Sequence, residues 1–96
     1  MKVTISERAE RNLDHIVHYL EQEWSVRVRD KFLELLERKI DQISEMPQLY
    51  EVSTKKKSVR RCVVSKQTSL YYRVNKREIE IITIQDNRKN PKKLKF

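Results

Sequence analysis

Lysine and arginine side chains gather in the second half of the chain, where they could bring several positive charges onto one surface. Arginines lie within or just past a stretch rich in β-branched and aromatic residues, at Arg60, Arg61, Arg73 and Arg88. The lysines Lys55, Lys56 and Lys57 precede this stretch, and Lys89 follows it. Guanidinium and ammonium groups bind carboxylates and phosphates. These residues are therefore the candidates for contact with an acidic partner.

The charge of the chain is divided unevenly along its length. Residues 1–54 carry a net charge of −3 and residues 55–96 a net charge of +11, which together give the +8 of the whole chain. A basic half of this kind suits a nucleic acid, an acidic protein or a membrane surface. The alternative is a solvated surface that keeps the protein soluble. The segregation of charge favours a binding face.

Other kinds of site find little support in the sequence. His15 and His18 have no Cys or further His nearby at metal-ligand spacing, so we expect no metal and no cofactor. Cys62 is the only cysteine; it has no His or Asp partner at a recognisable spacing and suits a reducing cytoplasm. We expect no membrane association, because no apolar run approaches the ~18 residues of a membrane span and no signal peptide opens the chain.

Short strands supply the framework for the basic residues. Runs at 59–64, 69–74 and 79–84 are separated by polar gaps of hairpin length, which predicts a three-stranded antiparallel meander. In the middle run, alternation directs Leu70, Tyr72 and Val74 toward the core and leaves Tyr71 and Arg73 on the exposed face. The first run fits either orientation, with Arg60 and Cys62 on one side and Arg61 on the other.

A short strand and two helices precede the meander. Residues 2–5 alternate between polar and apolar and predict a first strand in the same sheet. Apolar residues then recur at helical spacing over 9–24 and 28–43, with Ser6 and Ser25 as candidate N-caps.

Almost no loop separates the two helical patterns, so they should form an antiparallel hairpin that lays one apolar face on the sheet. We interpret Trp24 as an anchor at the edge of the core, and Pro47 as the end of the second helix. The sequence thus predicts one α+β domain over residues 1–96, in the order β-α-α-β-β-β.

This organisation resembles the RelE/ParE superfamily of bacterial toxins from type II toxin-antitoxin modules. The resemblance covers nearly the whole chain and is carried by the helical start at 9–24, Pro47, the Val59-Arg60 strand, the strand at 70–74 and the basic ending at 86–91. It implies a growth-inhibiting toxin that forms a hetero-oligomer with a cognate acidic antitoxin, whose disordered segment folds on binding.

The superfamily has two branches with different targets. RelE-like members cut mRNA on the ribosome, with cations on the exposed sheet face stabilising the charge that gathers on phosphorus. ParE-like members inhibit DNA gyrase by binding and need no catalytic set. In a nuclease reading, the transition-state cations of this chain would be Arg60, Arg73 and Arg88.

Several departures from the nuclease pattern favour the ParE-like branch. Cys62 and Ser69 stand where such nucleases carry cations, and one lost preorganised donor can cost about 100- to 1000-fold in rate. The chain ends in Lys95 and Phe96 where a Tyr or His is expected, and Tyr71 does not match that position. Leu94 and Phe96 could pack against the fold or belong to a frayed end.

We therefore predict a gyrase-binding toxin, with a ribosome-dependent mRNA endoribonuclease as the alternative. A plain nucleic-acid-binding module is disfavoured, because Tyr71 is the only clear exposed aromatic on the strands. The predicted target-binding residues are Lys55, Lys56, Lys57, Arg60, Arg73, Arg88 and Lys89.

Overall fold

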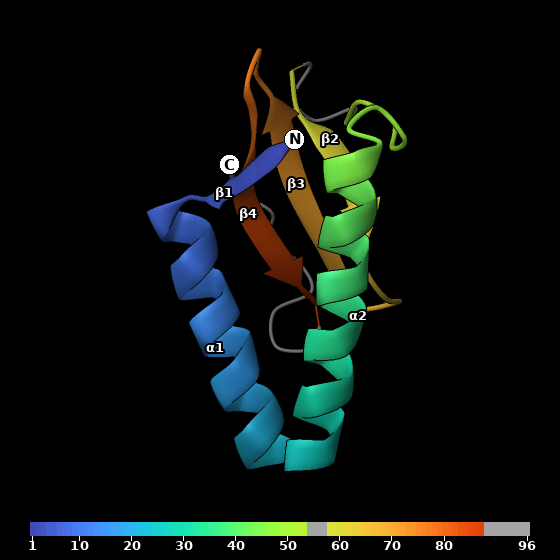
Figure 1. Ribbon diagram of the computed structural model, residues 1–96. Helices are drawn as coiled ribbons and strands as arrows, with labels where there is room; N and C mark the ends of the chain where they lie inside the picture. The colour runs from blue at the N-terminus through green and yellow to red at the C-terminus, as the bar shows by residue number, and fades with distance from the viewer. Residues whose placement is uncertain (54–57, 88–96) are drawn as a thin grey trace.

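Two helices pack on one face of a four-stranded sheet in a computed structural model that describes residues 1–53 and 58–87 (Figure 1). The elements in chain order are β1 (Lys2–Ile5), α1 (Glu7–Glu23), α2 (Val26–Glu45), β2 (Arg60–Val63), β3 (Thr68–Val74) and β4 (Glu78–Asp86). The predicted α+β class and element order are confirmed. The predicted contacts at 55–57, 88 and 89 lie outside the described residues.

The sheet has the strand order β1-β4-β3-β2. Strands β2, β3 and β4 form the predicted antiparallel meander, while β1 pairs in parallel with β4. Strand β4 therefore lies inside the sheet, as expected for a run that is apolar at almost every position. The outer edge of β2 is partly covered by the linker from α2, since Arg61 N donates to Glu51 O at 3.1 Å and Ser53 N donates to Val59 O at 2.6 Å.

Serine caps begin both helices, as predicted. Ala9 N donates to Ser6 Oγ at 3.0 Å and Val28 N donates to Ser25 Oγ at 3.1 Å. In each case the hydroxyl satisfies an N–H group that the first helical turn leaves unpaired. Helix α2 ends at Glu45, just before Pro47. Neither helix of the described ranges has a stretch apolar enough to cross a membrane.

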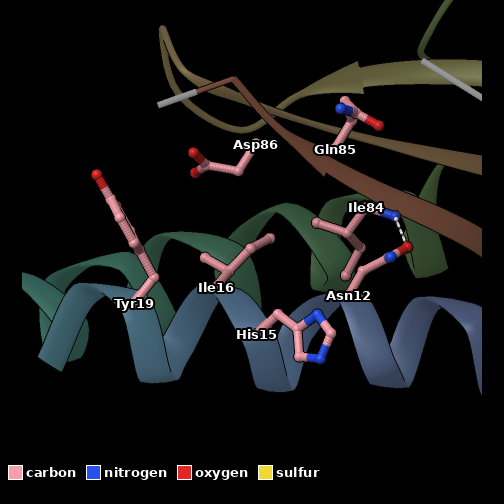
Figure 2. Close-up of a pocket in the computed structure, with 7 residues that line it drawn as sticks. All are labelled: Asn12, His15, Ile16, Tyr19, Ile84, Gln85 and Asp86. Atoms are coloured by element: carbon pink, nitrogen blue, oxygen red, sulfur yellow. Dashed lines mark hydrogen bonds between the residues drawn. The ribbon is translucent and has the colours of Figure 1, made fainter. Parts of the chain in front are cut away.

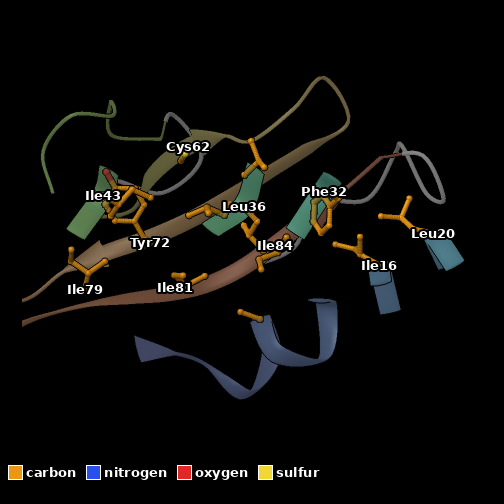
Figure 3. Close-up of a cluster of buried hydrophobic side chains, with 13 residues drawn as sticks. Ile16, Leu20, Phe32, Leu36, Ile43, Cys62, Tyr72, Ile79, Ile81 and Ile84 are labelled. Atoms are coloured by element: carbon orange, nitrogen blue, oxygen red, sulfur yellow. The ribbon is translucent and has the colours of Figure 1, made fainter. Parts of the chain in front are cut away.

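The hydrophobic core lies between the helices and the sheet (Figure 3). Its buried members include Ile16, Leu20, Phe32, Leu36, Ile43, Cys62, Leu70, Tyr72, Ile79 and Ile81. The helical members recur at intervals of four or seven residues, and the strand members at intervals of two, which matches the predicted faces.

Trp24 does not belong to this core, contrary to prediction. Helix α1 ends at Glu23, and Trp24 is the C-cap residue, with a non-helical backbone and 59% of its surface exposed. Because helical geometry stops before Trp24, the four-residue spacing from Leu20 no longer places it on the apolar face. Figure 1 shows that the connection between α1 and α2 extends past the end of the sheet.

Helix α1 completes the hydrogen bonding of β4. Strand β1 pairs only with Glu78–Ile81, so beyond Ile81 no strand among residues 1–53 and 58–87 lies beside that edge of β4. Ser6 Oγ donates to Ile82 O at 2.7 Å. Asn12 Oδ1 accepts from Ile84 N at 3.1 Å and from Thr83 Oγ1 at 2.8 Å. Ser6, the N-cap of α1, and Asn12 within that helix thus make hydrogen bonds to β4 that a neighbouring strand would otherwise make.

Substitution of Asn12 should measure the value of this contact. Asn12→Ala removes the acceptor for two partly buried donors, and we expect a loss of about 1–3 kcal/mol in the free energy of unfolding, measured with urea. Asn12→Asp is the matched control, because it keeps an acceptor oxygen at the same position and should recover most of that loss. Equal destabilisation by both variants would contradict the role assigned to the acceptor.

Candidate functional site

Strand pairing divides the basic residues between the two faces of the sheet. Cys62 lies opposite Leu70 and is fully buried in the core, which settles the orientation of β2. Side chains alternate along a strand, so Arg61 and Val63 point away from the helices. We call this side the outer face and define it by Arg61, Val63, Ser69, Tyr71 and Arg73.

The structure does not bring Arg60 and Arg73 together. Arg60 lies opposite Tyr72 on the helix-facing side of the sheet, and its Nη1 donates to Tyr50 O at 2.6 Å. Arg73 follows Tyr72 in β3 and therefore points to the outer face. There its Nη1 lies 3.9 Å from Glu80 Oε1, and about a third of each side chain is exposed. A partly solvated ion pair at this distance adds little stability, so Arg73 can exchange Glu80 for another anion.

Arg61 is the basic residue that shares the outer face with Arg73. It lies directly opposite Tyr71, is exposed, and donates from Nε to Ser69 Oγ at 3.3 Å. The sequence analysis includes Arg61 among the basic candidates, but the predicted set of target-binding residues leaves it out, because the orientation of β2 was left open. The burial of the small residue Cys62 is the signal that decides the orientation of β2. In the described part of the chain, Arg61 and Arg73 are the two arginines on the outer face that are candidates for contact with a target.

Tyr71 points to the outer face but is buried, so the prediction that it is exposed is wrong. Only 3% of its surface is accessible, compared with 9% for Ser69 and 2% for Thr83, its neighbour in β4. Alternation predicts which face a side chain occupies, but it does not predict what covers that face. In this conformation Tyr71 cannot supply a proton to a substrate on the surface.

The thiol and the two phenols near β2 are held in their neutral forms. Desolvation raises the pKa of the Cys62 thiol and of Tyr72. Desolvation, followed by a hydrogen bond with Cys62, raises the pKa of Tyr50 to about 12. Tyr72 also donates to Pro47 O at 2.8 Å. These groups are protonated at neutral pH, so they provide neither a nucleophile nor an acid matched to pH 7.

A separate cavity of about 380 Å³ lies between α1 and the end of β4 (Figure 2). It is lined by Asn12, His15, Ile16, Tyr19, Ile84, Gln85 and Asp86. Asn12 already accepts the two hydrogen bonds of β4, and Thr68 Oγ1 donates to Asp86 Oδ2 at 2.7 Å. No group of three or more His, Cys, Asp or Glu residues within 1–53 and 58–87 could hold a metal ion. His15 and His18 are exposed.

The buried state of Cys62 has a direct chemical readout. We expect its thiol to react with a disulfide reagent at pH 8 only as the protein unfolds, because it is inaccessible and its pKa is raised. Val63→Cys is the matched control, since Val63 is the next residue, points outward and is 47% exposed. The introduced thiol should react at once. Equally fast reaction of both thiols would contradict the burial.

Comparison with known proteins identifies the family that this chain resembles. The family model described as "ParE toxin of type II toxin-antitoxin system, parDE" matches residues 3–91. The comparison with curated protein sequences found no match.

Solved structures with the same fold cover nearly the whole chain. A chain of "Chromosomal ParDE TA system from P. aeruginosa" is 21% identical, with a TM-score of 0.67 over 90% of this chain and 95% of the other. "YoeB/ParE toxin from Agrobacterium tumefaciens" is 12% identical, with a TM-score of 0.68 and coverage of 91% and 99%. The Staphylococcus aureus YoeB dimer is 14% identical, with a TM-score of 0.63 and coverage of 88% and 94%.

Proposed function

The chain belongs to the ParE toxin family of type II toxin-antitoxin systems, and from that membership we propose that it inhibits growth by binding DNA gyrase. Membership of this family implies an antitoxin partner. We further propose that the antitoxin contributes an acidic segment, that the two proteins form a hetero-oligomer, and that the toxin acts in the cytoplasm.

The separation of Arg60 from Arg73 is the observation that best supports binding over catalysis. RNA cleavage needs several cations around one phosphate and an acid within hydrogen-bond reach. Arg60 and Arg73 point to opposite faces of the sheet, so they cannot both contact one phosphate. Tyr71 is buried, and burial keeps the phenols of Tyr50 and Tyr72 protonated at neutral pH.

A binding role fits the basic residues that remain accessible. Arg61 and Arg73 share the outer face and could each contact a carboxylate of an acidic protein surface, which would also speed encounter through long-range attraction. Lys55, Lys56, Lys57, Arg88 and Lys89 are proposed contacts from the sequence alone. Arg60 is retained as a proposed contact, although its guanidinium already donates to Tyr50 O.

Ribosome-dependent mRNA cleavage remains the second candidate function. It is favoured by the exposed position of Arg61 beside Arg73 on the sheet face that a nuclease of this superfamily would use. Arg88, the third proposed transition-state cation, lies outside the described residues. In this alternative the purified protein should cut mRNA on programmed ribosomes and leave gyrase unaffected.

The proposed target can be tested by plasmid supercoiling with purified gyrase and ATP. We expect the protein to inhibit supercoiling and to trap cleaved DNA in a dose-dependent way, because it would bind gyrase and hold the cleaved complex. Addition of the antitoxin should reverse both effects. Normal supercoiling at micromolar protein, together with mRNA cleavage on ribosomes, would overturn the proposal.

The contribution of the outer face can be tested by removing its charges. We expect the double variant Arg61→Gln/Arg73→Gln to need about tenfold more protein for half-inhibition of gyrase, because two charge contacts worth about 0.7 kcal/mol each amount to about 1.4 kcal/mol. The double variant Lys66→Gln/Arg77→Gln removes the same charge from exposed positions in the two hairpin turns and should change inhibition little. Equal weakening by both would indicate a general charge effect.

A further inference from the structure

An exposed apolar groove lies where the chain leaves α2 and passes the end of β3. The N-terminus and the ends of α2 and β3 lie at the same end of the molecule (Figure 1). The groove has a volume of about 460 Å³, within the range of ligand sites. Its walls are formed by Met1, Met46, Pro47, Gln48, Leu49 and Val74. Met1, Met46 and Leu49 are each between 46% and 57% exposed, so the groove is open to solvent.

Hydrogen bonds hold the walls of this groove in place. Ser44, in the last turn of α2, donates from Oγ to Met1 O at 2.6 Å. Tyr72 Oη donates to Pro47 O at 2.8 Å, which ties the start of the linker to β3. Both methionines of the chain line the groove. Ordered walls reduce the entropy that binding must overcome, while flexible thioether side chains adapt to the apolar surface of a partner.

The groove offers what a segment that folds on binding needs. Such a segment must bury apolar surface to offset the conformational entropy that it loses. Of the residues that define the outer face, only Val63 is an exposed large hydrophobic residue. The groove brings Met1, Met46 and Leu49 together. It is therefore better suited than the outer face to hold the apolar side chains of such a partner.

The charges beside the groove are divided between two sides. Lys2 in β1 and Lys76 and Arg77 in the β3–β4 turn are exposed on one side. None of these three forms an ion pair with a residue of 1–53 or 58–87. Glu45 at the end of α2 and Glu51 in the linker are exposed on the other side. Carboxylates of a partner would therefore be attracted to the β3–β4 turn and repelled from the linker.

We propose that this groove holds an acidic, amphipathic segment of the antitoxin. Its apolar side chains lie on Met46 and Leu49, and its carboxylates face Lys76 and Arg77. Glu78 lies opposite Lys2 in β4 and offsets one charge, so the basic side keeps two of its three positive charges. The inference rests on one part of the proposed function, the acidic segment of the antitoxin, and it is independent of gyrase.

Calorimetric titration with the purified cognate antitoxin tests the apolar contacts. We expect Met46→Ser/Leu49→Ser to raise the Kd at least tenfold, because it makes the floor of the groove polar. Trp24→Ser/Val26→Ser is the matched control, since these residues are 59% and 53% exposed at the other end of α2. It should change the Kd less than twofold. All four side chains are exposed, and circular dichroism should confirm that both variants fold.

The divided charges predict effects of opposite sign. Lys76→Gln/Arg77→Gln should weaken antitoxin binding about fivefold, as expected for two surface charge contacts. Glu45→Gln/Glu51→Gln should strengthen it, because repulsion of the acidic segment is removed. Both effects should shrink as salt is added. A change in the same direction for both variants would contradict the orientation of the segment.

The proposal is overturned if Met46→Ser/Leu49→Ser binds the antitoxin as tightly as the unmodified chain, or if the control weakens binding equally. An altered oligomeric state of that variant with an unchanged Kd would assign the groove to a second copy of the chain. If the unmodified chain does not bind the antitoxin, the proposed partnership fails as well. Gyrase inhibition without antitoxin should be the same for both variants, so failure of the gyrase proposal is recognised separately.

A second measurement decides if Met46→Ser/Leu49→Ser fails to fold. A photoreactive benzophenone amino acid in place of Leu49, in the otherwise unchanged chain, should cross-link to the bound antitoxin. The same amino acid in place of Trp24 should not. Cross-linking from Trp24 alone, or from neither position, would overturn the proposal.

Discussion

The half-paired edge of β4 is the constraint on which the rest of the structure depends. This strand lies inside the sheet, yet β1 accompanies it only as far as Ile81. Ser6 and Asn12 satisfy the backbone groups that follow, which would otherwise be costly to leave unpaired near the core. They also fix α1 along the strand, so Ile16 and Leu20 fall over the sheet. The short connection at Ser25 then places α2 beside α1.

Alternation along β2 and β3 converts a basic sequence into two chemically different faces. Arg60 is held against Tyr50 on the helix side, whereas Arg61 and Arg73 share the outer side. The same number of positive charges on one face would suit phosphate chemistry, but divided between two faces they suit contact with separate anions. For this fold, the orientation of a four-residue strand therefore bears strongly on which activity the surface can support.

Local signals predicted the elements well, and the site less well, for physical reasons. The caps at Ser6 and Ser25, the stop at Pro47 and the three strand runs depend on hydrogen bonds and steric limits of neighbouring residues, which the sequence displays. The prediction for Trp24 was wrong because this residue lies one position past the end of α1, where the backbone is no longer helical. The burial of Tyr71 and the separation of Arg60 from Arg73 depend on tertiary cover and strand orientation, which no single run of residues encodes.

The linker residues beside β2 have a consequence for how the protein behaves at high concentration. Glu51 and Ser53 occupy backbone positions along the outer edge of that strand, including those of Val59 and Arg61. An open edge is a template on which another copy can add a strand and begin an aggregate. Because the linker pairs with part of the edge of β2, it shortens this template and discourages self-association through that strand.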